Sequence, residues 1–207
     1  MSTKTKENAR VLVLASGSRY RRELLERLAM PFEVSAANID ETPRPNESPG
    51  VAALRLAEAK ARAIATGRSG TLVIGSDQVA DLDGRHVGKP GNHAAAVAQL
   101  KALSGRTVTF HTGVAVCDAD CDADSGRCRG TLVDVVSTFR NLSDVEIDDY
   151  LRREKPYDCA GAVKSERLGI ALFERIVSDD PTALIGLPLI ALIDLLRAEG
   201  VVVVGTR

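Results

Sequence analysis

The feature that most constrains the fold is a short, unbroken apolar run followed by a small-residue turn and a helical pattern. Residues 11–15 are all apolar, and residues 19–29 repeat apolar side chains on one helical face. Such runs are typical of strands in a covered sheet, and such helices pack against its faces. Residues 71–75 form a second buried run, which continues into residues 76–80. The sequence therefore predicts an α/β fold.

The rest of the chain alternates predicted strands and helices, separated by residues typical of turns. We expect strands at residues 32–36, 107–117 and 131–139, and helices at residues 51–65, 92–103, 143–153 and 184–196. Asn92 is a predicted N-cap, and Ser143 with Glu146 forms a predicted capping box. We expect a loop at residues 38–49 closed by Pro49-Gly50, a hairpin turn at Asp83-Gly84, a polar hairpin loop at residues 118–130 and a short strand or tail at residues 201–204.

Length and charge limit the classes of protein that remain. The 207 residues fit one domain, which we place at residues 11–207, after a flexible extension at residues 1–10. Lys plus Arg is 27 and Asp plus Glu is 28, which argues against binding along a nucleic acid. No secretory signal is recognisable, and no apolar stretch reaches the roughly 20 residues that span a membrane. We therefore expect a cytoplasmic protein with no membrane partner.

A candidate phosphate site lies at the start of the first predicted helix. Small residues at Ser16, Gly17 and Ser18 allow backbone N–H groups to approach an anion, and Arg21 adds a fork-shaped donor nearby. The stretch is not a P-loop and matches no strict fingerprint. The alternative, a helix that starts with serine and exposes its arginines, remains open.

Acids and lysines elsewhere suggest a site for a metal and a phosphate. Glu41 lies in an acidic loop that suits Mg²⁺, and Asp77 follows a buried strand, where α/β proteins place catalytic groups. Lys89 lies in a rigid Gly-Lys-Pro turn, and Lys60 lies on the helix after the acidic loop. Each residue also has a structural explanation without a function. Glu41 could belong to a solvated acidic turn, Asp77 could cap a turn, and Lys60 and Lys89 could be surface lysines.

Other patterns that suggest a metal do not hold. The stretch that contains Cys117, Cys121 and Cys128 has Ala123 where a calcium loop needs glycine and Arg129 where it needs an acid. Its cysteine spacing matches no common zinc site, so a polar hairpin tip is favoured, and the sequence leaves the redox state open. The scattered histidines form no catalytic triad and no metal motif.

Taken together, the motifs resemble the Maf family of nucleoside triphosphate pyrophosphatases from residue 11 to about residue 200. The matching segments, in order, are residues 14–18 with Arg21-Arg22, 40–43, 56–61, 75–78, 88–90, 160–166 and 186–189. Three positions look like the branch that acts on 7-methyl-GTP, because they are Tyr20, Gln78 and Glu166, where the dTTP and UTP branch carries Arg, Thr and Gln. Arg19 departs from the family, which usually has proline there.

The resemblance implies a mixed, elongated sheet flanked by helices, with two lobes around a central nucleotide cleft, as in inosine triphosphatases. It implies hydrolysis of a nucleoside triphosphate to the monophosphate and pyrophosphate, with Mg²⁺ or Mn²⁺ as cofactor, and a homodimer. The implied catalytic residues are Asp77, as general base, with Lys60 and Lys89. The other implied roles are phosphate binding for Ser16, Arg21, Lys60 and Lys89, metal binding for Glu41 and Asp77, and base selection for Tyr20, Gln78 and Glu166.

The preference for a methylated guanine has a physical rationale. The methylated ring is cationic, so the face of Tyr20 would attract it by roughly 0.5–2 kcal/mol. Glu166 could accept two hydrogen bonds from the guanine edge, and we expect a site with an unmatched carboxylate to reject pyrimidines by several kcal/mol. The rival functions are hydrolysis of dTTP and UTP, and a regulatory nucleotide-binding module without turnover that is linked to cell division. A regulator would leave Asp77 and Glu41 without a role.

Overall fold

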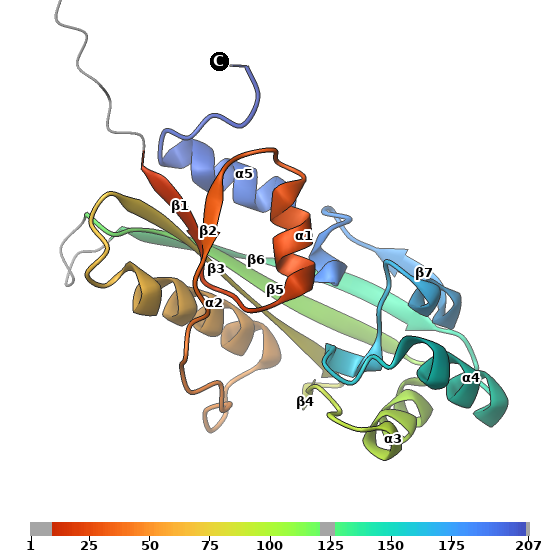
Figure 1. Cartoon of the computed structure of the whole chain (residues 1–207). Coiled ribbons are helices and arrows are strands. Elements are labelled where there is room, and N and C mark those ends of the chain that lie inside the picture. The colour runs from red at the N-terminus through yellow and green to blue at the C-terminus, as the bar shows by residue number, and fades with distance from the viewer. Residues whose placement is uncertain (1–9, 121–126, 206–207) are drawn as a thin grey trace, which may run out of the picture.

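The computed structural model describes residues 10–120 and 127–205, and a central mixed sheet organises them (Figure 1). Six of its seven strands follow the order β2-β1-β3-β5-β6-β7, and the seventh, β4, pairs with β3. The strands are β1 Val11–Leu14, β2 Phe32–Val34, β3 Thr71–Leu82, β4 Arg85–Val87, β5 Thr107–Asp118, β6 Cys128–Phe139 and β7 Phe173–Val177. The helices are α1 Arg19–Glu26, α2 Pro49–Ala65, α3 His93–Leu103, α4 Asp144–Glu154 and α5 Leu189–Ala198, with short 3-10 turns η1 Ala160–Ala162, η2 Leu168–Leu172 and η3 Ala183–Ile185.

Parallel pairing is confined to one end of the sheet. Strand β1 runs parallel to both β2 and β3, whereas β3, β5 and β6 form a long antiparallel meander. The antiparallel strands reach well beyond β1, and they connect two groups of helices (Figure 1). The predicted fold class, a mixed elongated α/β sheet with two lobes, is confirmed.

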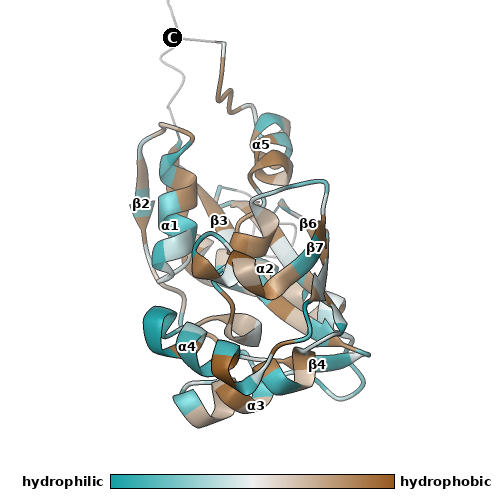
Figure 2. Cartoon of the chain, turned by 90° about the vertical axis from the view of Figure 1, so that its right-hand side faces the viewer, coloured by the Kyte–Doolittle hydropathy of each residue, from teal (hydrophilic) through white to brown (hydrophobic). Residues whose placement is uncertain are grey.

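Three packed clusters give each lobe its own core. At the β1 end, α1 and α5 bury leucines against one face of the sheet, and the small side chains of α2 cover the other face. At the far end, α3, α4 and the η1 and η2 turns enclose a third cluster around Phe110 and Phe139. Helices α1 and α4 carry hydrophilic and hydrophobic residues side by side, as helices on a protein surface do (Figure 2).

One edge of β3 is uncovered between the two lobes. Strand β1 pairs with β3 only as far as the Leu14–Ile74 pair, and β4 pairs with it only from Ala80 onward. The stretch between, residues 75–79, has a strand partner on the β5 side alone. Successive side chains of a strand point to opposite faces, so this gap makes residues of both faces reachable from one place.

The structure corrects several predicted boundaries. Pro49 and Gly50 begin helix α2 and do not close a loop, since proline is well suited to the first helical turn. The predicted helix at 184–196 is two elements, because Gly186 has φ +122° and Pro188 precedes the true start of α5 at Leu189. The sequence analysis missed strand β7, whose five residues lack a clean alternation.

Other boundaries change less. Helix α1 ends at Glu26, and residues 201–204 form no strand. The predicted caps of α3 and α4 are confirmed, including the reciprocal capping box of Ser143 and Glu146. The proposed loop at 118–130 is shorter than predicted, because β6 begins at Cys128.

Part of that hairpin loop, and most of the predicted N-terminal extension, lie outside the described residues. Cys121 is among them, whereas Cys117 and Cys128 face each other across β5 and β6 and form a disulfide. Arg10 ion-pairs with Asp118 at the start of the sheet, at 2.8 Å. Within the described part of the chain, no helix has the length and apolar character needed to cross a membrane.

Helix α2 lies unusually close to the sheet because glycines stand beneath it. A Cβ atom at Gly75 on β3 would overlap the carbonyl oxygen of Ala57, and one at Gly113 on β5 would lie 2.5 Å from the carbonyl oxygen of Ala53. Alanines on the facing side of α2 complete the contact. Close approach of backbone to backbone therefore fixes how far α2 stands from β3.

We expect Gly75→Ala to lower the free energy of unfolding by about 3 kcal/mol, because overpacking forces helix and strand apart. Urea denaturation of the purified variant measures this. Gly88→Ala is the matched control, since an added Cβ there meets nothing within 4 Å. A Gly75→Ala protein as stable as the control would show that the contact tolerates a methyl group.

Candidate functional site

A pocket of about 670 Å³ opens at the uncovered edge of β3, between the two lobes. Its volume is in the range of small-molecule sites. Residues from the α1 turn, the loop before α2, β3, β4 and the segments around η1 and η3 line it. All nine site residues predicted from the sequence line this one pocket, and they are Ser16, Tyr20, Arg21, Glu41, Lys60, Asp77, Gln78, Lys89 and Glu166.

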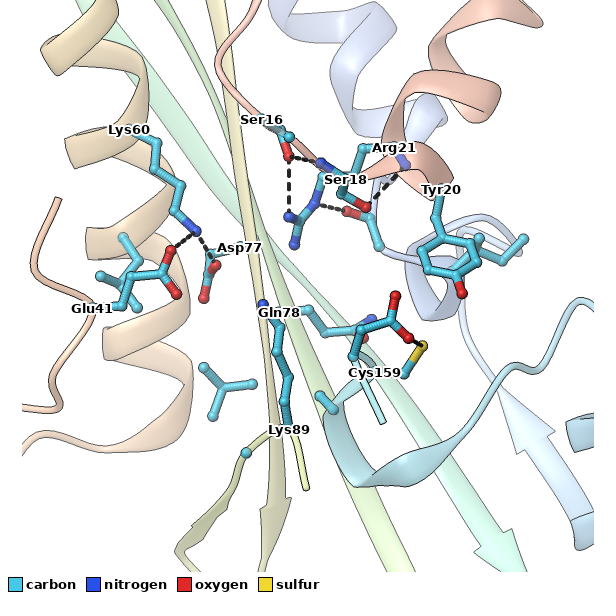
Figure 3. A pocket seen from close by; sticks show the side chains of 18 of the residues that line it. Ser16, Ser18, Tyr20, Arg21, Glu41, Lys60, Asp77, Gln78, Lys89 and Cys159 are labelled. Carbon is cyan, nitrogen blue, oxygen red and sulfur yellow. Dashed lines mark hydrogen bonds and ion pairs between the residues drawn. The ribbon is translucent and has the colours of Figure 1, made fainter. Parts of the chain in front are cut away.

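An acidic pair bridged by a lysine occupies the α2 side of the pocket (Figure 3). The Nζ atom of Lys60 lies 2.6 Å from Oδ1 of Asp77 and 2.7 Å from Oε1 of Glu41. Lys60 and Asp77 are buried, whereas Glu41 is half exposed. Burial alone would raise the pKa of Glu41, but the hydrogen bond from Lys60 and the charges of Lys60, Lys89 and Arg21 hold it below its usual value.

Neighbouring residues settle two of the open alternatives. Asp40 lies outside the pocket and accepts a hydrogen bond from the Thr42 N–H at 2.9 Å, so it belongs to a solvated turn. Arg22 pairs with Glu26 on the exposed side of α1. Of Asp40 and Glu41, it is therefore Glu41 that lines the pocket, and of Arg21 and Arg22 it is Arg21.

The residues of the predicted phosphate cradle lie where β1 turns into α1. Ser18 caps α1, and Oγ of Ser16 accepts a hydrogen bond from the backbone N–H of Ser18 at 3.2 Å. The Arg21 guanidinium donates to the carbonyl oxygen of Gly186 at 2.8 Å and to Oγ of Ser16 at 3.4 Å. Burial lowers the pKa of Arg21, opposed by the charges of Asp77 and Glu41. The arginine is thus held in place, with its charge directed at the acidic side of the pocket.

Lys89 enters the pocket from the other lobe. Its side chain extends from the loop after β4 toward the region between Asp77 and Gln78 (Figure 3). The loop is anchored because the carbonyl oxygen of Gly88 accepts hydrogen bonds from Nε2 of Gln99 and from the Gly161 N–H. Cationic groups from three elements, α1, α2 and the β4 loop, therefore converge on one space.

Gln78 lines the pocket, and its side-chain amide supports one of the pocket walls. Its Nε2 atom lies 2.9 Å from the carbonyl oxygen of Ala183, 3.0 Å from that of Leu184 and 3.0 Å from Oγ1 of Thr112. The amide nitrogen is therefore committed to protein acceptors. Gln78 holds the η3 segment against the sheet, and that segment forms a wall of the pocket.

The opposite end of the pocket carries the Tyr20 ring, the Arg19 guanidinium, the Cys159 thiol and the carboxyl groups of Asp158 and Glu166. Burial raises the pKa of Tyr20 to about 12, although the hydrogen bond from Arg19 opposes this. Burial and the neighbouring Asp158 raise the pKa of the Cys159 thiol to about 12, against a hydrogen bond with Tyr20. Both groups are thus neutral near pH 7, and Glu166 is exposed at the rim.

The sequence analysis overlooked two residues at this end, Asp158 and Cys159. Cys159 Sγ lies 3.5 Å from Oδ1 of Asp158, and both side chains line the pocket beside Tyr20. They directly precede the matched motif at residues 160–166, and that adjacency was the available signal. Arg19 also stacks on the Tyr20 ring, with its guanidinium carbon 4.7 Å from the ring centroid.

The acidic side of the pocket suits a divalent cation that arrives with its own oxygen ligands. No group of three or more His, Cys, Asp or Glu side chains that could hold a metal exists among residues 10–120 and 127–205. Mg²⁺ usually binds to one or two carboxylates together with phosphate oxygens and water. Glu41 and Asp77, already gathered around one cationic nitrogen, match that donor set.

Several known proteins are similar to this chain over most of its length. The chain is 59% identical to the 7-methyl-GTP pyrophosphatase of Ralstonia nicotianae over 186 residues, 90% of this chain and 94% of that protein. It is 57% identical to the protein of that name from Cupriavidus metallidurans, over 91% of this chain and 93% of the relative. A solved HAM1 protein from Coxiella burnetii is 17% identical, with a TM-score of 0.41, over 78% of this chain and 97% of that one. The family model described as Maf-like protein matches residues 11–199, so the chain belongs to the Maf family.

Proposed function

We propose that this protein hydrolyses 7-methyl-GTP to 7-methyl-GMP and pyrophosphate. The observation that carries the proposal is the convergence of Arg21, Lys60, Lys89, Glu41 and Asp77 on one pocket from separate elements. Such a pocket suits a triphosphate at one end and, beside Tyr20, a purine base at the other. The names of the relatives, at 54–59% identity, support the same substrate.

The residues of the chain divide the work of the reaction. Ser16, Arg21 and Lys89 would bind the phosphate oxygens, and Lys60 would join them. Asp77 would take a proton from a water molecule while the oxygen of that water bonds to the α-phosphorus. The bond from that phosphorus to the bridging oxygen then breaks, and pyrophosphate leaves with the bonding electrons. A Mg²⁺ or Mn²⁺ ion held by Glu41 and Asp77 would supply charge neutralisation to the triphosphate.

The end of the pocket beside Tyr20, where the nucleobase would bind, favours a cationic purine. The Tyr20 ring and the nearby carboxylates of Asp158 and Glu166 would attract a positively charged ring. Because Glu166 is exposed, its carboxylate stays hydrated even when the bound base offers it no hydrogen-bond donor. The penalty for pyrimidines is therefore smaller than the several kcal/mol expected from the sequence. Gln78 would act on this end by holding the η3 wall.

The remaining expectations follow from this function. A single small nucleotide is the proposed partner, with neither a nucleic acid nor a membrane, and the cytoplasm is the proposed location. The homodimer implied by the family resemblance stays a prediction, since a single chain does not test it.

We expect Asp77→Asn to lower kcat at least about 100-fold, the usual contribution of a general base. Binding of an α,β-methylene analogue of 7-methyl-GTP, measured by calorimetry, should persist, because the cationic groups remain. Asp194→Asn is the control, because Asp194 is an exposed residue of α5 that does not line the pocket. Turnover close to wild type in Asp77→Asn would remove Asp77 from the role of base.

A panel of nucleoside triphosphates with added inorganic pyrophosphatase and phosphate detection tests the substrate. We expect the highest kcat/KM for 7-methyl-GTP, and we expect Glu166→Gln to lower its ratio to that for UTP by about tenfold, as for a lost charged hydrogen bond. Glu174→Gln, an exposed glutamate outside the pocket, should leave the ratio unchanged. A wild-type preference for UTP or dTTP would refute the proposed substrate.

A further inference from the structure

The Lys60 ammonium occupies the position between two carboxylates that a divalent cation would need. Its Nζ atom contacts Oδ1 of Asp77 and Oε1 of Glu41 at 2.6 and 2.7 Å, respectively. The three groups come from separate elements, α2, β3 and the loop before α2 (Figure 3). Two carboxylates this close repel each other unless a cation lies between them, and here the lysine supplies that charge.

The burial of Lys60 makes this contact hard to exchange for water. Its side chain is 8% exposed and that of Asp77 is 11% exposed. A charge removed from water is strongly disfavoured unless it is paired. Lys60 can therefore leave the carboxylates only when other anionic groups receive it. The triphosphate proposed to lie between Arg21 and Lys89 is such a group.

We propose that Lys60 and the divalent metal compete for Glu41 and Asp77, and that the nucleotide relieves this competition. This inference rests on the proposed function. When phosphate oxygens attract the ammonium, the two carboxylates become free for the metal, whose remaining ligands are phosphates and water. Metal and nucleotide then each strengthen the binding of the other, as thermodynamic linkage requires. Without nucleotide, the lysine keeps the metal affinity low.

Among the described residues, Lys60 forms ion pairs with two carboxylates, those of Glu41 and Asp77. No set of three or more His, Cys, Asp or Glu side chains forms a metal site in the described part of the chain. The protein therefore offers a metal few ligands before the nucleotide arrives. Close packing of α2 on β3 at Gly75 keeps Lys60 beside Asp77 in that state.

Binding of Mn²⁺ to the nucleotide-free protein, followed by electron paramagnetic resonance, tests the competition. We expect Lys60→Met to bind Mn²⁺ about tenfold more tightly than wild type, a shift typical of coupled sites, because the competing charge is gone. Lys60→Arg keeps the charge and should bind as weakly as wild type. Lys101→Met is the matched control, since Lys101 pairs with Asp144 at 2.8 Å on the exposed side of α3.

Removing one carboxylate identifies where the ion binds. In the double variant Glu41→Gln with Lys60→Met, the gain in Mn²⁺ affinity should be lost. Mn²⁺ affinity of Lys60→Met equal to or below that of wild type would overturn the proposal. None of these measurements involves turnover, so they are independent of the substrate panel.

A crystal structure of the wild-type protein decides the matter if Lys60→Met does not fold. With Mg²⁺ and the α,β-methylene analogue bound, Nζ of Lys60 should have left both carboxylates and should contact a phosphate oxygen. A metal bound to Glu41 and Asp77 while Lys60 still bridges them would overturn the proposal.

Discussion

The close contact of α2 with β3 and β5 sets the positions of the groups that form the site. Gly75 and Gly113 lie directly beneath the backbone of α2, and alanines on the facing side of the helix leave no space between. Lys60 is one turn along the same face from Ala57, the residue whose carbonyl oxygen abuts Gly75. The steric constraint that closes the core thus also brings the lysine to Asp77.

The open edge of β3 explains how one strand serves both sides of the pocket. Gly75 and Asp77 face α2, whereas Ser76 and Gln78 face the opposite side and hydrogen-bond to the η3 segment and the residue after it. If β3 were paired on both edges here, the sheet would separate Asp77 from Ser76 and Gln78. Because β1 ends early and β4 begins late, the pocket reaches around the edge. Asp77, the proposed general base, and Gln78, whose amide supports the pocket wall, are therefore neighbours in sequence.

Features that depend on residues close together in the sequence could be predicted from it. The caps at Asn92 and Ser143 and the turn at Asp83-Gly84 rest on residues within four positions, and the structure contains all of them. The break before α5 and the strand β7 were missed, because an apolar run does not show where tertiary packing divides it. The hydrogen bonds from the Gln78 amide to Ala183 and Leu184 could not be predicted either, because they join residues more than 100 positions apart in the chain.

The sequence by itself determined which chemical groups this protein has and the order in which they occur. Its motifs predicted the mixed α/β fold, the family and nine residues that line one pocket. Tertiary structure alone decided that Lys60 bridges Glu41 and Asp77, that Gln78 supports a wall, and that Asp158 and Cys159 border the base end. The physical reason is distance: ion pairs and amide contacts act over about 3 Å, and only folding brings together residues that are remote in sequence.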